Sequence, residues 1–379
     1  MARREGNPDI LEDGGERRRA TIHDVARDCG VSLSTVSNAL AGKSNVKEET
    51  RQRVLATAER LGYRASMVAR ALRMQRSFTI GVLIADVANP ASPDFVRGIE
   101  DMAVRENCTL LLCNTDGDET RQIAHMRSLL DQQVDGMVLI SQYCEGPVVR
   151  GLLETGTPFV LLQRRTPLFA DDYVGADNFT GITESMRHLI DLGHRRIAFV
   201  RGPVESSTAQ ERFDAYLHNV ASFGLDSDPE LVCLGHYSVE GGYAAAMRLL
   251  ALDRPPTAIL ASNDMSAMGV LNATAEHGID VPSQLSLVGF DDIQLASFAR
   301  INLTTTHLPK RDMGAAAAGL LMNRIESKEQ LSQQTVIFPT RLIVRGTTAP
   351  VRTVRPRIRI AARSHRAGRD RAGWRGPQG

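Results

Sequence analysis

The chain has 379 residues, of which 42% are hydrophobic and 5% aromatic, and its formal net charge at pH 7 is +1. This length exceeds one small domain and predicts two or three domains, and the composition is typical of a soluble α/β protein. The sequence contains no apolar run of membrane-spanning length and no apolar signal core near Met1, so we expect a cytoplasmic protein with no membrane partner. Its five cysteines are dispersed and form no CxxC pair, so we expect reduced thiols.

The segment that begins at Thr21 predicts two short helices joined by a tight turn. Thr21 can cap the first helix, and Gly30 supplies the turn because the residue there must leave right-handed backbone space. Ser32 can cap the second helix, on which Val36 and Leu40 are expected to point inward. Such a pair can place its second helix in the major groove of DNA, although two amphipathic helices around a glycine also occur in other folds.

A third amphipathic helix is predicted from about Lys47 to Leu61. We expect its apolar residues Val54, Leu55 and Ala58, together with Leu61, to close a three-helix core.

The charges along the chain are segregated. Residues 20–76 hold ten Lys and Arg against five Asp and Glu, whereas residues 77–350 hold 21 against 33. A basic head on an acidic body is the distribution expected of a phosphate-binding module joined to a sensor. Ordinary surface scatter would explain the head alone about as well, but not the head together with its helix pattern.

The order and spacing of several motifs in this region resemble the lactose/galactose repressor family (LacI/GalR). The matching residues are Thr21-Ile-His-Asp-Val-Ala, Gly30-Val-Ser, Thr35-Val-Ser, Thr50-Arg, Leu61-Gly-Tyr and Val68-Ala-Arg-Ala-Leu-Arg73. The resemblance extends over about residues 20–350. It implies a helix-turn-helix DNA-binding domain at 20–64, a hinge helix at 65–77 and an effector-binding, dimerisation domain at 78–350.

The resemblance also implies which residues contact DNA. In the head these are Thr21, Ser32, Leu33, Ser34, Thr35, Ser37 and Asn38. Leu33, Ser34 and Asn38 hold the principal base-reading positions, and many relatives have Arg where Asn38 stands. Because Asn favours adenine and Arg favours guanine, we expect an operator that differs from the common half-site at that base. The alternative for Asn38 is an ordinary solvated residue of a helix.

The hinge segment contributes a second set of expected DNA contacts. By resemblance, Leu72 wedges into the central base step of a palindrome from the minor groove, and Ala69 permits close approach. Arg70 and Arg73 would contact the DNA backbone or the edge of the groove, and Ser66 stands where relatives often have Asn. Read without the resemblance, the stretch could equally be a linker between domains. One wedge bends DNA little, so a homodimer on a double-stranded operator is implied.

From residue 78 onwards, continuous apolar strands alternate with amphipathic helices. The predicted strands are 78–85, 109–113, 136–140, 159–162, 196–200, 258–261 and 285–290, and one helix is expected over 96–105. This pattern predicts parallel sheets covered on both faces, and its length predicts two lobes with a cleft. The resemblance implies a body like the periplasmic sugar-binding proteins, with one lobe at about 78–162 plus a segment after Asp291, and the other at about 163–290 plus residues near the end.

Eight residues are expected to bind a small-molecule effector in the cleft, by their match to family positions. They are Asp86, Asn89, Gln163, Arg212, Tyr237, Asn263, Asp264 and Asp291. Carboxylates, amides and a guanidinium around an aromatic ring suit a polyhydroxylated ligand, because each hydroxyl group both donates and accepts hydrogen bonds. For Asn263 and Asp264, helix capping is an equally good explanation.

Two departures from the family pattern affect the ligand. Ala91-Ser92-Pro93 replaces aromatic residues, and Gln163-Arg164 stands where sugar-binding members often carry Asp before Arg. The loss of an aromatic floor and an acidic acceptor weakens a monosaccharide assignment and leaves room for a larger, acidic or phosphorylated ligand.

Both ends of the chain are expected to be disordered extensions, at 1–19 and 351–379. The second holds nine Arg against one Asp, and it has no leucine heptad that would support a coiled-coil tetramer. Auxiliary contact with DNA phosphates is the alternative for the arginines at both ends.

The sequence offers no catalytic motif. It contains no GxxxxGK[ST], HExxH or GxSxG and no cysteine–histidine cluster, so we expect no metal site, no cofactor and no enzyme activity. We expect a homodimeric, effector-controlled transcriptional regulator, most simply a repressor. The alternative is a small-molecule-binding protein with a degenerate DNA-binding head, and an enzyme built on the α/β body is a more distant one.

Overall fold

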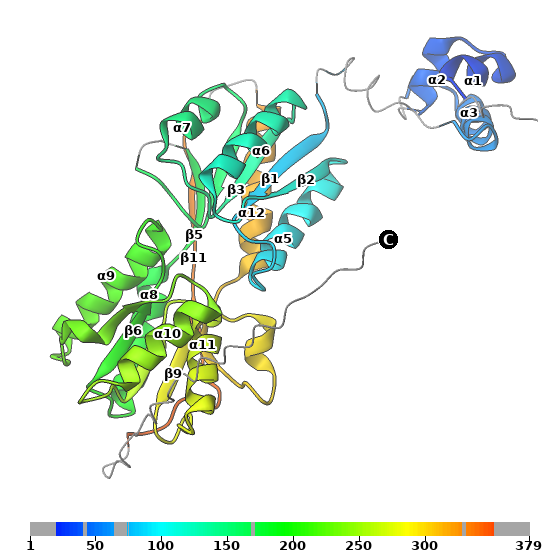
Figure 1. Cartoon of the computed structure of the whole chain (residues 1–379). Helices are drawn as coiled ribbons and strands as arrows, with labels where there is room; N and C mark the ends of the chain where they lie inside the picture. Colours follow the sequence, from blue (N-terminus) through cyan, green and yellow to red (C-terminus); the bar gives the residue numbers. More distant parts are fainter. Residues whose placement is uncertain are drawn as a thin grey trace, which may run out of the picture. The chain divides into compact units, whose positions relative to one another are not determined.

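The computed structural model describes residues 20–40, 44–63, 74, 76–167, 171–327 and 331–351. The chain divides into two units, Met1–Ser77 and Phe78–Gly379, which are described separately (Figure 1). The hinge residues Ser66, Ala69, Arg70, Leu72 and Arg73 lie outside the described residues, as do both terminal extensions up to residue 19 and from residue 352.

The first unit contains a three-helix bundle. Its helices are α1 (Ile22–Cys29), α2 (Leu33–Leu40) and α3 (Glu48–Arg60). The core buries Val25, Ala26, Cys29, Val36, Ala39, Val46, Val54 and Ala58. Leu40 and Leu61 pack on this core while only partly buried. The predicted bundle is therefore confirmed, with one error. Leu55 is 46% exposed, because each step along a helix turns by about 100° and takes Leu55 off the face of α3 that buries Val54 and Ala58.

The caps predicted for the first two helices are present. Thr21 and Asp24 form a capping box, in which each side chain accepts a hydrogen bond from the other residue's backbone N–H. Gly30 ends α1 in the left-handed conformation, with φ of 62°. The Oγ of Ser32 accepts a hydrogen bond from the N–H of Thr35 at 3.1 Å. These local interactions fix the angle between α1 and α2.

The second unit is built from two lobes, each around a six-stranded sheet. The first sheet has the order β11-β5-β4-β3-β1-β2, and every pairing in it is parallel. Its strands are β1 (Thr79–Ile84), β2 (Thr109–Asn114), β3 (Gly136–Ile140), β4 (Phe159–Leu162), β5 (Asp172–Ala176) and β11 (Thr335–Phe338). We call this half of the unit the N-lobe.

Helices cover both faces of the N-lobe sheet. The helices are α5 (Ser92–Arg105), α6 (Glu119–Asp131), α7 (Pro147–Leu153) and α12 (Lys310–Glu326). Alternation along β1 separates the two faces: Val82 packs in the cluster that includes α5 and α12, and Leu83 packs in the cluster with α6 and α7. Both faces are thus buried, which is why the strands read as continuous apolar runs.

The second sheet forms the C-lobe and has the order β12-β10-β9-β8-β6-β7. All its described pairings are parallel except that of β12 with β10. Its strands are β6 (Ile197–Arg201), β7 (Val232–Leu234), β8 (Ala258–Ala261), β9 (Ser286–Asp291), β10 (Thr304–His307) and β12 (Arg341–Ile343).

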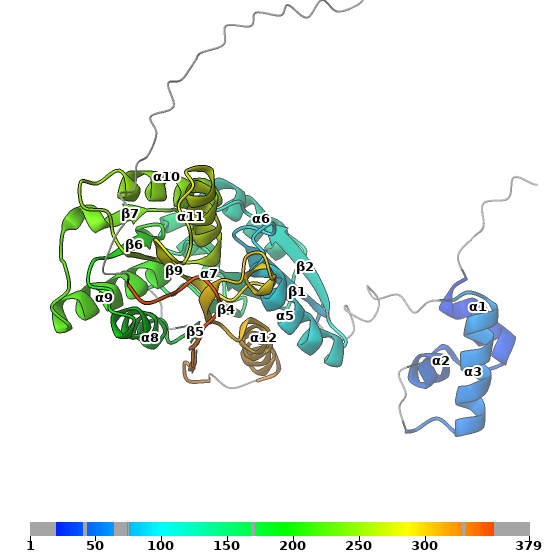
Figure 2. The same cartoon turned by 90° about the horizontal axis from the view of Figure 1, so that it is seen from below.

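The C-lobe sheet also carries helices on both faces. They are α8 (Asn178–Asp191), α9 (Ser207–Ser222), α10 (Val239–Leu250) and α11 (Asp264–Glu276), with short 3₁₀ turns η1 (Pro229–Leu231) and η2 (Gln294–Ser297). Figure 2 shows α8, α9 and α12 along one side of the strands and α6, α10 and α11 along the other. Among the described helices, none combines the length and apolarity needed to cross a bilayer.

The chain crosses between the lobes three times: after β5, after β10 and after β11 (Figure 1). The predicted lobe boundaries are wrong in detail. The N-lobe continues to Ala176, because β5 pairs with β4 and β11, and the C-lobe continues through β10 to His307. Only after this strand does the chain return to the N-lobe as α12, which packs against α5.

The sequence patterns located the apolar strands well but missed the polar or short ones. Strands β3, β4 and β8 have the predicted bounds, and β1, β2, β6 and β9 agree within two residues at each end. No strand was predicted at β5, β7, β10, β11 or β12. The helix expected over 96–105 begins earlier, at Ser92, because Pro93 fits the first turn of a helix, where no N–H donor is needed.

Candidate functional site

The start of α2 is exposed on the surface of the three-helix bundle. Leu33 is 40% exposed, and Ser32 and Ser34 beside it are exposed as well. Thr35, Ser37 and Asn38 are half-buried. The structure therefore presents the three expected base-reading residues, Leu33, Ser34 and Asn38, on the surface of α2 while Val36 and Ala39 anchor the helix from below.

The hydroxyl groups at the start of α2 are linked to each other. The Oγ of Ser32 lies 2.8 Å from the hydroxyl oxygens of both Ser34 and Thr35. Thr21 is similarly engaged, because its hydroxyl donates to Asp24 at 2.7 Å within the capping box. These bonds hold the side chains in fixed positions, so the face is preorganised for contacts with a phosphate or a base edge.

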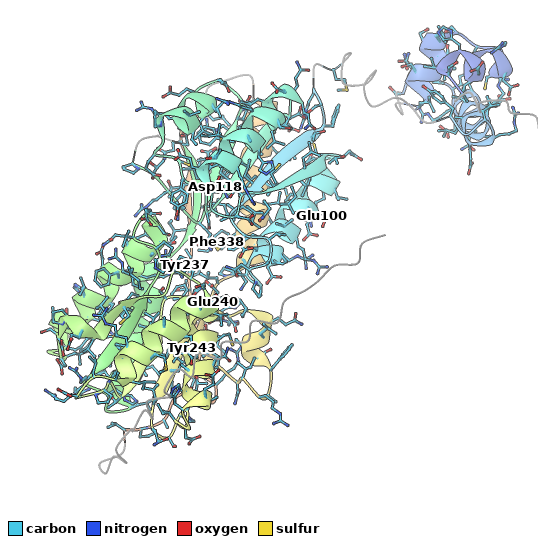
Figure 3. All side chains as sticks on the ribbon, viewed as in Figure 1. Glu100, Asp118, Tyr237, Glu240, Tyr243 and Phe338 are labelled. Atoms are coloured by element: carbon cyan, nitrogen blue, oxygen red, sulfur yellow. The ribbon has the colours of Figure 1, made fainter. Side chains whose placement is uncertain are left out.

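A second site lies in the other unit, where a cavity of about 310 Å³ opens between the two lobes. Seven of the eight residues expected to bind an effector line it: Asp86, Asn89, Gln163, Arg212, Tyr237, Asn263 and Asp291. They come from both lobes and follow strands β1, β4, β7, β8 and β9, apart from Arg212, which belongs to α9. In the sticks view, Tyr237 lies at the level where the lobes meet (Figure 3).

Asp264, the eighth expected residue, does not line the cavity. It is completely buried, and its carboxylate accepts hydrogen bonds from the Oγ1 of Thr305 at 2.5 Å and the N–H of Ile293 at 2.9 Å. Burial, together with the nearby charge of Asp291, raises the pKa of Asp264. Asp264 therefore braces β10 and the segment after β9 instead of facing the cavity.

Arg212 lines the cavity and joins α9 to α8, to the segment after β8 and to the end of β9. Its Nε donates to the side chain of Asn178 at 2.8 Å, and its Nη1 donates to the carbonyl of Ser262 at 2.5 Å. The guanidinium lies 3.8 Å from the centroid of the Phe290 ring and 3.8 Å from a carboxylate oxygen of Asp291. With only 3% of its surface exposed, Arg212 is held rigidly and largely satisfied by the protein itself.

Asp291 ends β9 in an unusual backbone conformation, with φ of 118°. Its side chain is 11% exposed, and burial raises the pKa of its carboxyl group while Arg212 and Lys310 oppose that rise. A positive φ is strained for a residue with a side chain, and Asp291 lines the cavity from this position.

Tyr237 and Asn263 form the C-lobe wall. The amide of Asn263 donates to the carbonyl of Tyr237 at 3.2 Å, while its oxygen caps α11 by accepting from Ser266. The sequence left helix capping and ligand contact open for Asn263. In the structure Asn263 caps α11 and also lines the cavity. The hydroxyl of Tyr237 is buried and has no hydrogen-bond partner among the described residues, so it is available to a ligand.

On the N-lobe side, short side-chain bonds fix the loop after β1. Asp86 accepts from the N–H of Ala88 at 2.8 Å, and Asn89 accepts from the N–H of Ala91 at 3.0 Å. Ser92, one of the residues that replace the family's aromatic ones, donates to the carbonyl of Asp86 at 2.7 Å and lines the cavity. A small polar residue therefore occupies this part of the wall.

Several lining residues were not in the set expected from the sequence. They are chiefly Ser92, Asp116, Ser141, Tyr143, Arg164, Ser206, Thr208 and His236. Most of them directly follow β1, β2, β3, β4, β6 or β7, so the rule that ligands bind at the carboxyl ends of parallel strands could have identified them. Among the described residues, no group of three or more His, Cys, Asp or Glu side chains could hold a metal ion.

Two family models match the chain. Residues 21–66 match the model described as bacterial regulatory proteins, lacI family, and residues 186–348 match a periplasmic binding protein-like domain. The first match contains α1–α3 and the second contains most of the C-lobe together with α12.

The similarity to individual relatives extends over most of the chain. The chain is 34% identical to catabolite control protein A of Priestia megaterium over 329 residues, which are 86% of this chain and 99% of that protein. It is 33% identical to the ribose operon repressor of Escherichia coli (strain K12), again over 86% of this chain and 99% of that protein. Among solved structures, a lac repressor dimer bound to operator and the anti-inducer ONPF matches with a TM-score of 0.78 and 26% identity, covering 88% of this chain and all of that one.

Proposed function

Because this chain belongs to the LacI family of bacterial regulatory proteins, we propose that it represses transcription from a palindromic operator, to which it binds as a homodimer, under the control of a small molecule bound in the interlobe cavity. The fold is that of the family, a helix-turn-helix head and a two-lobed periplasmic-binding-protein-like body, and the chain is a DNA-binding transcriptional regulator.

One observation carries the DNA-binding role: the head holds its second helix rigidly while leaving the reading face of that helix exposed. Leu33, Ser34 and Asn38 are our proposed base contacts, and Thr21, Ser32, Thr35 and Ser37 our proposed backbone contacts. Leu33 suits an apolar group such as a thymine methyl, and Asn38 suits a bidentate bond with adenine. The solved lac repressor relative is a dimer on its operator, which supports two such heads on one palindrome.

The cavity supports control by a carbohydrate-related effector. Its lining combines carboxylates (Asp86 and Asp291), amides (Asn89 and Asn263) and the aromatic hydroxyl of Tyr237. These groups accept and donate hydrogen bonds in the mixture that a polyhydroxylated molecule requires. A ribose operon repressor among the relatives supports the same class.

Control requires that the effector binds one arrangement of the lobes more tightly than the other. Closure of the lobes around a ligand would shift the N-lobes within the dimer and so change the spacing of the proposed hinge segments at 65–77. A difference in binding free energy of about 1–3 kcal/mol between the two states is sufficient. Leu72 is our proposed wedge in the minor groove, with Ser66, Ala69, Arg70 and Arg73 around it.

The remaining assignments follow from this role. We propose five segments: an extension at 1–19, the DNA-binding domain at 20–64, the hinge at 65–77, the effector-binding and dimerisation domain at 78–350, and a basic tail at 351–379. The relatives are transcriptional regulators, and we propose that this chain acts at the nucleoid in the cytoplasm and catalyses no reaction.

Selection of binding sites from a random duplex pool, with the purified full chain and no added ligand, tests the proposal. We expect enrichment of a palindrome with a flexible central step. A matched variant, Ser34→Ala combined with Asn38→Ala, should fold but lose the preferred half-site, because Ser34 is exposed and Asn38 is only half-buried, so neither belongs to the core of the bundle. If folded wild-type protein enriches no sequence, even in the presence of a cell extract's small molecules, the alternative of a binding protein with a degenerate head is favoured.

A further inference from the structure

We infer that the effector carries an anionic group, a carboxylate or a phosphate, which Arg164 binds in the cavity. This inference rests on the proposed effector control and names the chemical class of the effector.

Arg164 is placed in the cavity by the way β4 ends. Gln163, the residue that follows β4, has φ of 75°, a conformation that turns the chain sharply after the strand. The hydroxyl of Tyr173, on neighbouring β5, donates to the carbonyl of Gln163 at 2.9 Å and holds this turn. Arg164 is consequently 7% exposed and lines the cavity, while Gln163 lines it at 8% exposure.

The guanidinium of Arg164 lacks the partners that its neighbours have. Its Nε and Nη1 are buried and have no hydrogen-bond partner, and within the described residues no carboxylate forms an ion pair with it. By contrast, Arg165 pairs with Glu211 at 2.7 Å and Arg212 lies 3.8 Å from Asp291. A buried cation without a counter-charge is costly, and an anion that enters the cavity would remove that cost.

The guanidinium is held ready for such an anion by Tyr143. It lies 4.0 Å from the centroid of the Tyr143 ring, in cation–π contact. The backbone of Tyr143 is fixed in turn by Gln122 of α6, whose buried amide donates to the carbonyl at 2.6 Å and accepts from the N–H at 3.3 Å. The platform under Arg164 is therefore rigid before any ligand binds.

The start of α9 adds to the positive potential at this end of the cavity. The N–H of Arg165 donates to the hydroxyl of Ser207, the first residue of α9, at 3.0 Å, and Ser206 and Thr208 line the cavity. The N-terminus of a helix carries a partial positive charge that favours an anion nearby. The amide of Gln163 is neutral and can donate a hydrogen bond, so no residue next to Arg164 in the sequence supplies the missing negative charge.

The acidic residues of the cavity do not cancel Arg164. Asp291 lies close to Arg212, and Asp116 is paired with Arg121, a residue that does not line the cavity. Asp86 is exposed and follows β1, which is separated from β4 by β3 in the sheet. Asp86 and Asp291 are thus acceptors for hydroxyl groups at other positions, and the complementary ligand is a polyhydroxylated acid: a sugar acid or a sugar phosphate.

The first test uses inorganic phosphate as the probe. The midpoint of thermal unfolding of the full chain is measured in potassium phosphate and in potassium chloride at equal ionic strength and pH, for the wild type, Arg164→Gln, Arg164→Lys and Arg127→Gln. Arg127 is exposed on α6, so its variant controls for the change in net charge. We expect phosphate to stabilise the wild type, Arg164→Lys and Arg127→Gln, but not Arg164→Gln. Equal stabilisation of all four proteins, or of none, would overturn the inference.

The second test distinguishes the two sources of the anion. Calorimetric titrations compare glucose, glucuronate and glucose 6-phosphate on the wild type and on Gln163→Asp. An anionic sugar should bind at least about tenfold more tightly than glucose, and Gln163→Asp should reverse this order by supplying a carboxylate beside Arg164. Preference for glucuronate assigns a carboxylate and preference for the phosphate assigns a phosphoryl group. Tighter binding of glucose to the wild type contradicts the inference. If no sugar binds, the phosphate test decides.

Failure of this inference can be separated from failure of the proposed function. The same protein preparation is tested for selection of operator DNA. If the protein selects a palindrome but does not respond to anions, only the inference of an anionic effector is contradicted. If the protein selects no palindrome and also shows no anion response, the proposed role as a DNA-binding regulator is contradicted as well.

Discussion

The Nζ of Lys310 lies 3.2 Å from the carbonyl oxygen of Asp292, and it also donates to the carbonyl of Asp291. Lys310 is the first residue of α12, in the N-lobe, whereas Asp291 ends β9 of the C-lobe and Asp292 directly follows that strand. One buried ammonium group, 3% exposed, therefore ties the two lobes together beside the cavity.

Removal of this tie should weaken the second unit. In Lys310→Met the two carbonyl groups lose their donor, so we expect the free energy of unfolding to fall by about 1–3 kcal/mol. Urea denaturation followed by circular dichroism measures the change. The control is Arg311→Gln, the next residue of α12, whose exposed ion pair with Asp101 should contribute far less to stability because solvent screens it. Equal losses in the two variants would show that Lys310 is not a special contact.

The identity of one helix residue should set one base of the operator. Asn38→Arg is expected to shift the preferred base from adenine to guanine at a single position of each half-site, with a discrimination of about 1–3 kcal/mol. Site selection followed by sequencing compares the variant with the wild type. An unchanged preference at every position would exclude Asn38 from the reading face.

The proposed wedge gives a prediction about specificity. Leu72→Ala should weaken binding to the selected palindrome more than binding to an unrelated duplex, because only the specific complex contains the bent central step. Titrations of both duplexes at one salt concentration measure the two affinities. If both affinities fall by the same factor, Leu72 acts as a general contact and the wedge is wrong.

The buried carboxyl group of Asp264 predicts a pH dependence. Its pKa is raised by burial and by Asp291, so the folded chain favours the protonated form more than the unfolded chain does. The stabilisation is complete below the ordinary aspartate pKa of about 4 and is lost as pH rises towards the raised value. Asp264→Asn stays neutral, so its stability relative to the wild type should increase between pH 5 and 8, as measured by thermal unfolding. Parallel pH profiles would be inconsistent with a raised pKa.

Two glycines of α12 should respond in opposite ways to the same substitution. A Cβ at Gly314 would lie 2.1 Å from the carbonyl oxygen of Phe95 on α5, so Gly314→Ala must separate two packed helices. A Cβ at Gly319 would approach only Met102, at 4.0 Å, and alanine there should gain up to about 1 kcal/mol of helix propensity. We expect a loss of about 1–3 kcal/mol for Gly314→Ala. A stabilising Gly314→Ala would refute this account of the α5–α12 contact.

Local patterns were sufficient where a few neighbouring residues decide the conformation. The cap at Thr21, the left-handed turn at Gly30 and the cap at Ser32 depend on groups within four residues, and all three are present as predicted. Continuous apolar runs such as β3 were equally clear, because a strand buried on both faces leaves a signal in its own sequence.

Strand β10 shows what local patterns miss. Thr304, Thr305 and Thr306 are completely buried, although threonines do not form an apolar run. Their hydroxyl groups are satisfied by distant partners: Thr305 donates to Asp264, and Thr306 lies 2.9 Å from the hydroxyl of Ser185. Only the folded chain supplies these partners, so the sequence could not identify the strand or the lobe it belongs to.

The features of the cavity also fall into two groups, those that the sequence predicts and those that only the tertiary structure shows. The sequence determined that this chain has a DNA-binding head and a two-lobed body, and its match to family positions selected seven side chains that line the cavity. The tertiary structure decided that Asp264 turns inward to Thr305, and that Arg164 lies on Tyr143 without a counter-charge. The reason is that burial and pairing depend on residues brought together from distant parts of the chain, which no local pattern records.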